Sequence, residues 1–144
     1  MTHEVPADEA TAVIHRLRDC TNEHDLEAIV GCVALDYRNE TPLHPARGFV
    51  GREQVGRNWA QILTAVPDVT TEVIASATLG DVVWSEWEHR GTRADGSAHL
   101  MRGVIRFEVC DGVIASARMY LEPVEPHGDG VDAAVRRQVT PGQT

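Results

Sequence analysis

The chain has 144 residues, the usual length of a single domain, and its 42% hydrophobic and 24% charged residues are ordinary for a soluble globular protein. A formal net charge of −9 and the absence of lysine argue against nucleic acid and anionic membranes as main partners, because both are bound by clustered basic side chains. The spacing of the three cysteines, Cys20, Cys32 and Cys110, is not that of a metal site. The first residues are polar, unlike a secretory signal, and no apolar run is long enough to span a bilayer. We therefore expect a cytoplasmic protein with reduced thiols, no cofactor and no bound metal.

The first half of the chain is predicted to be mainly helical. Val13, Ile14 and Leu17 recur at the spacing of one helix face, and Pro67 ends the last helical pattern. The expected elements are, in chain order, a first helix from residue 8, a second helix over 26–33, a short strand over 37–42, a loop rich in Pro and Gly over 42–51, and a third helix over 52–66.

The second half is predicted to be a meander of strands over 69–79, 82–93, 98–110 and 113–122. Helices followed by strands, without βαβ alternation, indicate an α+β fold with three N-terminal helices packed on a strongly curved antiparallel sheet. We expect one domain over 1–125 and, over 126–144, a tail that is flexible or serves as a docking segment, with a weak helical pattern over 131–139.

Alternation along the strands predicts one apolar face and one charged face. The two faces stay together if residues 94–96 and 110–112 form three-residue loops. These loops pair Trp87 with Gly103, Gly103 with Met119, His89 with Met101, and Met101 with Leu121. The apolar face must lie under the helices. The charged face, with Trp84 and Tyr120 among opposite charges, is either solvated or the surface of a homodimer, and we favour the homodimer.

The order of elements and several short motifs resemble the nuclear transport factor 2-like superfamily, within it the branch of SnoaL-like polyketide cyclases, limonene epoxide hydrolases and ketosteroid isomerases. The motifs are Tyr37-Arg38-Asn39, the run Glu86-Trp87-Glu88-His89-Arg90-Gly91-Thr92, and Asp111-Gly112 with Arg118-Met119-Tyr120. The resemblance implies a cone-shaped cavity between the helices and the concave sheet, where alternation independently places the apolar face. A hydrophobic small molecule is then the expected ligand.

The family's catalytic residues carry over only in part. Tyr37 and Asn39 match the Tyr and Asn on the first strand of the epoxide hydrolases. Their Asp–Arg–Asp trio is replaced by His89, Trp87 and Met119, and the inward positions of the last strand hold no Asp. The water-activating machinery of the epoxide hydrolases is therefore missing.

His89 is the sharpest catalytic candidate, because an imidazole on the concave face is suited to proton transfer near neutral pH. It would act as the base, with Asn39 or Tyr37 donating to a developing enolate oxygen. The alternatives are a histidine hydrogen-bonded for structure alone, an Asn39 that begins a turn and a Tyr37 that only packs. The residues expected to contact a ligand are Trp59, Trp87, Met101, Gly103, Phe107, Met119, Leu121, His99 at the rim and the loop residue His44.

Three functions are consistent with this pattern. The first is a cofactor-independent enzyme that isomerises, cyclises or hydrates a hydrophobic substrate by general acid–base catalysis. The second is a non-catalytic protein that holds an apolar molecule in the same cavity. The third is a dimeric interaction module that works through its charged sheet face. Polar residues in an apolar cavity favour the first over the third.

Overall fold

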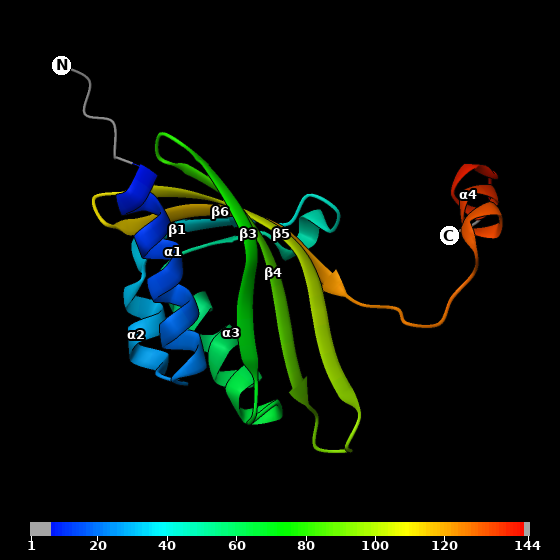
Figure 1. Cartoon of the computed structure of the whole chain (residues 1–144), viewed down its shortest axis with the longest axis horizontal. Helices are drawn as coiled ribbons and strands as arrows, with labels where there is room; N and C mark the ends of the chain where they lie inside the picture. Colours follow the sequence, from blue (N-terminus) through cyan, green and yellow to red (C-terminus); the bar gives the residue numbers. More distant parts are fainter. Residues whose placement is uncertain (1–6, 143–144) are drawn as a thin grey trace.

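The computed structural model describes residues 7–142 and consists of helices packed on one curved sheet (Figure 1). The helices are α1 (Ala7–Asn22), α2 (Leu26–Gly31), the short 3₁₀ turn η1 (Pro45–Arg47), α3 (Arg52–Ala65) and α4 (Val131–Val139). The strands are β1 (Val33–Glu40), β2 (Phe49–Val50), β3 (Thr70–Leu79), β4 (Val82–Thr92), β5 (Ala98–Cys110) and β6 (Val113–Pro123). The α+β fold is confirmed. The predicted domain over 1–125 includes residues 1–6, and the predicted tail over 126–144 includes residues 143–144. Both of these end segments lie outside the described residues.

The sheet has the strand order β2-β1-β6-β5-β4-β3 and is mixed, which corrects the prediction that it is wholly antiparallel. The exception is β1, which runs parallel to β6, with Asn39 opposite Ala117 and Glu40 opposite Arg118. This pairing joins an early strand to the last one, and the local sequence pattern carries no signal for it. The long strands bend over the helices in Figure 1, and register shifts near Ile74 and Ala115 mark bulges that add to the bend.

The predicted register is right between β4 and β5 and wrong between β5 and β6. Trp87 pairs with Gly103 and His89 with Met101, as expected. Gly103, however, pairs with Leu121 rather than with Met119, and the expected partnership of Met101 and Leu121 is also absent, since Met101 pairs with Pro123. The reason is the turn after β5.

The β5–β6 turn contains two residues, Asp111 and Gly112, both with positive φ, which is the backbone of a type I′ hairpin. Such a turn by itself would put the faces out of phase. The register shift at Ala115 adds one residue to β6 and restores the phase. The apolar residues of both strands therefore still face the helices, as predicted.

The core lies between α1, α3 and the concave side of the sheet. Its members include Val13 and Ile14 from α1, Val55 from α3, and Phe107 and Ile114 from the strands, all buried. Burial of such side chains is the main favourable contribution to folding. The core therefore fixes which sheet face the helices cover, and with it the face on which His89 lies.

The C-terminal segment forms a regular helix, α4, over the residues where the sequence showed only a weak helical pattern. The helix stands apart from the sheet in Figure 1, and none of its residues is buried. Val131, Val135 and Val139 are exposed at i, i+4 and i+8, so one side of the helix is apolar. That this tail docks on another surface stays a prediction. In the described part of the chain, no helix is long and apolar enough to cross a membrane.

Candidate functional site

His89 lies on the inner face of β4 between two tryptophans. Its ring centroid is 6.0 Å from that of Trp59 on α3 and 6.0 Å from that of Trp87, the residue two positions earlier on β4. Met101 on β5 and Thr71 on β3 stand opposite His89 in the ladders on either side. The structure therefore brings together four of the predicted site residues, which are Trp59, Trp87, His89 and Met101. They form one partly buried site that is mainly aromatic.

The His89 imidazole is neutral at physiological pH. Burial lowers its pKa from 6.5 to about 4, and the nearby His99 adds a smaller lowering. His99 on β5 is itself partly buried, and burial followed by Arg93 lowers its pKa as well. No hydrogen bond to the protein accounts for the His89 shift, so its ring is not engaged by a structural acceptor within residues 7–142. A neutral, unengaged imidazole can accept a proton from a ligand.

Trp87 forms a fixed wall of this site rather than a polar contact for a ligand. Its indole N–H donates to Ser85 Oγ at 2.8 Å, and the Ser85 hydroxyl donates to the Ile105 carbonyl at 2.8 Å. Trp87 also packs edge-on against Phe107, with centroids 6.2 Å apart. Because the indole N–H is already satisfied, Trp87 offers a ligand only its ring surface.

Thr71 is a polar residue of this site that the sequence analysis missed. Its side chain is buried, and its hydroxyl has no hydrogen-bond partner among the described residues. It stands directly opposite His89 on the neighbouring strand. Alternation along the predicted strand 69–79 would have placed Thr71 on the inner face beside Val69 and Val73, but its contact with His89 depends on the β3–β4 register.

Tyr37 and Asn39 form a second polar group, on β1. The Tyr37 hydroxyl donates to Asn39 Oδ1 at 2.8 Å, and both side chains are buried. Burial also raises the pKa of Tyr37, so its hydroxyl keeps its proton. Asn39 Nδ2 makes a long contact of 3.4 Å with Thr41 Oγ1. Tyr37 therefore fixes the orientation of the Asn39 amide.

The strand register separates Asn39 from His89, although the sequence analysis placed them near each other. Asn39 stands opposite Ala117 on β6, whereas His89 is linked through Met101 to Pro123 on the same strand. The positions 117 and 123 are roughly 20 Å apart along an extended strand, at about 3.3 Å per residue. Asn39 and His89 are therefore offset by six positions along the sheet and lie on strands that are not neighbours.

The remaining predicted site residues differ in their surroundings. Gly103 was expected to leave space for a ligand, but a Cβ there would lie 2.1 Å from the Tyr120 carbonyl oxygen, and its φ is +153°. Its missing side chain is therefore used by the close approach of β5 and β6. Phe107 is fully buried core, while Met119 and Leu121 are partly buried against it.

His44 lies on the loop after β1 and meets the end of β6. Its Nε2 is 3.0 Å from a carboxylate oxygen of Glu122, and both side chains are partly exposed. Glu122 pairs with Arg102, on the outward side of the strands. His44 therefore contacts the sheet's rim, and its role as a ligand contact stays a prediction. Within the described residues, no group of three or more His, Cys, Asp or Glu side chains is placed to hold a metal ion.

Comparison with known families identifies the fold. Residues 14–117 match the model of the SnoaL-like domain, which is most of the chain. The chain belongs to the SnoaL-like family. Its fold is that of the nuclear transport factor 2-like superfamily, as the sequence motifs predicted.

Solved structures resemble the SnoaL-like chain at low sequence identity. An epoxide hydrolase of the limonene type from Mycobacterium tuberculosis has a TM-score of 0.70 at 15% identity, over 82% of this chain and 86% of that one. IdmH from Streptomyces antibioticus, a proposed polyketide cyclase, has a TM-score of 0.69 at 23% identity, over 78% and 91%. RV0760c from Mycobacterium tuberculosis, in complex with estradiol-17beta-hemisuccinate, has 0.67 at 21%, over 78% and 92%. Among curated proteins, no sequence matches this chain.

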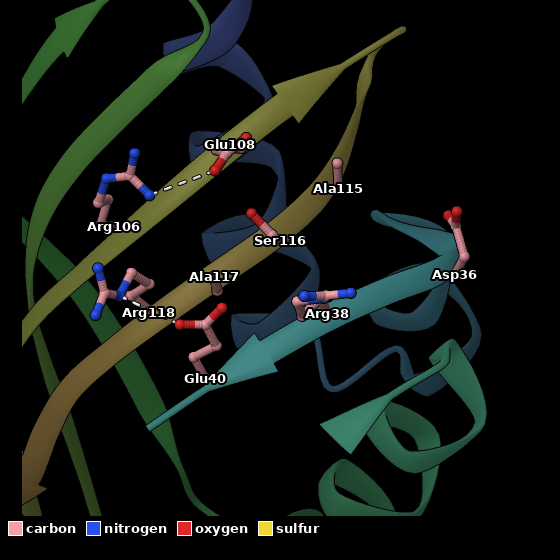
Figure 2. A pocket seen from close by; sticks show the side chains of 9 residues that line it. All are labelled: Asp36, Arg38, Glu40, Arg106, Glu108, Ala115, Ser116, Ala117 and Arg118. Atoms are coloured by element: carbon pink, nitrogen blue, oxygen red, sulfur yellow. Dashed lines mark hydrogen bonds and ion pairs between the residues drawn. The ribbon is translucent and has the colours of Figure 1, made fainter. Parts of the chain in front are cut away.

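The SnoaL-like domain also has a groove on its outer face, with a volume of about 400 Å³. Figure 2 shows its charged side chains on three adjacent strands, with Glu40 close to Arg118 and Arg106 close to Glu108. The Arg106 guanidinium also lies 5.7 Å from the ring centroid of the half-exposed Trp84. The groove is lined by Asp36, Arg38, Glu40, Arg106, Glu108, Ala115, Ser116, Ala117 and Arg118. This face therefore combines paired charges with an exposed aromatic ring.

Proposed function

We propose that the protein is a cofactor-independent enzyme that moves a proton on a hydrophobic ketone, with His89 as the base. The observation that carries this proposal is a neutral imidazole, partly buried between Trp59 and Trp87, that no protein group engages. The His89 ring nitrogens are not among the buried side-chain atoms that lack a partner, so a ligand can reach them. The tryptophan rings supply an apolar surface for a hydrophobic substrate.

The reaction follows from the properties of the imidazole. His89 accepts a proton from the carbon next to a substrate carbonyl, and the electrons of that C–H bond move to the carbonyl oxygen as an enolate. The imidazolium then returns the same proton to another carbon of the substrate, which gives an isomer and regenerates neutral His89. With a conjugate-acid pKa of about 4, His89 is as basic as a typical catalytic carboxylate and stays available at neutral pH.

The Tyr37–Asn39 pair supports an elongated substrate. Because Tyr37 donates to Asn39 Oδ1, the oxygen of the Asn39 amide is occupied. The Asn39 amide would therefore contact a ligand as a donor, through an N–H of Nδ2. Its separation from His89 along the sheet suits a second polar group at the far end of a molecule of several fused rings. In this proposal Asn39 binds and orients, and it does not take part in the proton transfer.

The test is isomerisation of a panel of β,γ-unsaturated cyclic ketones, followed by the ultraviolet absorbance of the conjugated product. His89→Gln is expected to abolish turnover, since a neutral amide accepts no proton at accessible pH. His127→Gln, at an exposed position of the tail, is the matched control and is expected to keep full activity. Equal turnover by His89→Gln and the wild type would refute the proposal. Ligand binding without turnover by the wild type would favour the non-catalytic binding protein.

We propose in addition that the outer sheet face joins two copies of the chain. The half-exposed Trp84 with Arg106 over its ring, next to the groove of Figure 2, supports this arrangement because aromatic and arginine side chains are enriched in interfaces. Light scattering after size-exclusion chromatography is expected to give a dimer for the wild type and a monomer for Trp84→Glu. Leu43→Glu, at an exposed loop position, is the control that should stay dimeric.

A further inference from the structure

The donor that stabilises an enolate must lie close to the base that creates it. The proton removed and the carbonyl oxygen belong to adjacent carbons of one substrate, and the donor must come within about 3 Å of that oxygen. Asn39, predicted from the sequence for this role, lies across three strand boundaries and at a different level of the sheet. The proposed reaction therefore needs another donor beside His89.

Thr71 is placed where such a donor is needed. Asn22, at the end of α1, bonds both backbone groups of Thr71: its Oδ1 accepts from the Thr71 N–H at 2.7 Å, and its Nδ2 donates to the Thr71 carbonyl at 3.0 Å. Those backbone groups therefore point away from β4, which makes Thr71 and His89 a non-hydrogen-bonded antiparallel pair. In such pairs the backbones are closest and the two side chains lie side by side on the same face.

The Thr71 hydroxyl also lacks the partner that a buried polar group normally has. The residue is only 6% exposed, and its Oγ1 has no hydrogen bond within the described residues. A valine of nearly the same shape would fill this position without an unsatisfied group. A ligand oxygen between Thr71 and His89 would supply the missing partner.

From this arrangement, and resting on the proposed function, we infer that Thr71 donates a hydrogen bond to the carbonyl oxygen of the substrate while His89 removes the neighbouring proton. The C–H bond breaks, its proton goes to the imidazole nitrogen, and the enolate oxygen keeps the hydrogen bond from Thr71 Oγ1. When the imidazolium returns the proton to the substrate, the carbonyl re-forms with no co-reactant consumed.

The surroundings also define the class of substrate group. The titratable neighbour that lowers the pKa of His89 is His99, and Arg93 in turn lowers the pKa of His99 near the rim. Among the described residues, no arginine acts on His89 to compensate the burial of a carboxylate or phosphate held there. The group recognised at this end is therefore an uncharged ketone, carried on an apolar ring that packs on Trp59 and Trp87.

Binding of two matched small molecules tests the inference without turnover. The probes are 1-indanone, which has a ketone, and indane, which has the same ring system without oxygen, each titrated by two-dimensional NMR. The wild type is expected to bind the ketone about tenfold more tightly than the hydrocarbon, the effect of one hydrogen bond to a buried donor. Thr71→Val should remove this preference, and Thr71→Ser, which restores a hydroxyl, should recover it.

Thermal unfolding of the same variants gives a second readout. Because Thr71→Val removes an unsatisfied buried hydroxyl, its melting temperature without ligand should rise by about 2–4 °C, while a hydroxyl with a structural role would make it fall. The inference is overturned if the wild type shows no preference for the ketone, if Thr71→Val keeps the preference, or if Thr71→Val lowers the melting temperature. Turnover of Thr71→Val should fall mainly in kcat. If His89→Gln abolishes turnover while Thr71→Val keeps it, the role of Thr71 is refuted and the proposed role of His89 as the base stands.

Discussion

The burial of His89 predicts a specific dependence of stability on pH. In the folded protein its pKa is about 4, whereas in the unfolded chain it has the ordinary value of 6.5. Between these two values the unfolded state binds the proton and the folded state does not. The stability contributed by neutral His89 is therefore complete above about pH 6.5 and is lost as the pH falls toward 4.

The size of the effect follows from the two pKa values. The full difference of about 2.5 units corresponds to roughly 3 kcal/mol, of which about 1.4 kcal/mol is lost by about pH 5.5 and about 2.6 kcal/mol by about pH 4.5. Replacement by phenylalanine keeps an aromatic ring between Trp59 and Trp87 and removes the titration. The carboxylates and the other histidines are common to both proteins, so their contributions largely cancel in the comparison.

The assay is urea unfolding of the wild type and His89→Phe at about pH 7, 5.5 and 4.5. We expect the wild type to lose stability relative to the variant by the amounts above as the pH falls. His99→Asn serves as a control. His99 contributes less than burial to the low pKa of His89, so this variant should lose nearly as much stability as the wild type when the pH falls. If the two proteins respond to pH in parallel within about 0.5 kcal/mol, His89 is solvated and the reasoning about a buried base fails.

Three further predictions follow from named contacts. Ser85→Ala should cost about 1–3 kcal/mol of unfolding free energy in urea, because it leaves the buried indole N–H of Trp87 without an acceptor, and a cost near zero would contradict this. Gly103→Ala should destabilise by at least about 2 kcal/mol in the same assay, because its Cβ would meet the Tyr120 carbonyl at 2.1 Å, whereas a neutral effect would show that the strands can separate there. The kcat/KM of an active substrate should rise with pH to half its maximum near 4, as His89 loses its proton, and a midpoint near 6.5 would assign the base elsewhere.

The sequence predicted the elements of this fold well because each has a local signal. The strand expected over 82–93 is found at Val82–Thr92, and the helix expected over 52–66 is found at Arg52–Ala65. Their apolar periodicities and the flanking Gly, Asp and Pro residues are properties of neighbouring residues alone. The inner and outer faces of β4 were predicted for the same reason.

The errors concern relations between distant segments. The Asp111–Gly112 turn has the sequence of a two-residue hairpin, but the compensating bulge at Ala115 has no signal, since alanine fits either face. The parallel pairing of β1 with β6 decides where Asn39 lies, and no local pattern encodes it. Thr71 was missed because its significance depends on the residue opposite it.

The low pKa of His89 bears on which chemistry this site can perform. An uncharged base has little desolvation cost in an apolar site until it receives a proton, whereas a carboxylate of the same basicity would have that cost before any ligand binds. The burial that keeps His89 neutral makes its imidazolium a strong acid. A strongly acidic imidazolium returns its proton to the substrate readily and holds it only briefly. That property suits isomerisation and cyclisation, in which the proton comes back to the substrate within one turnover.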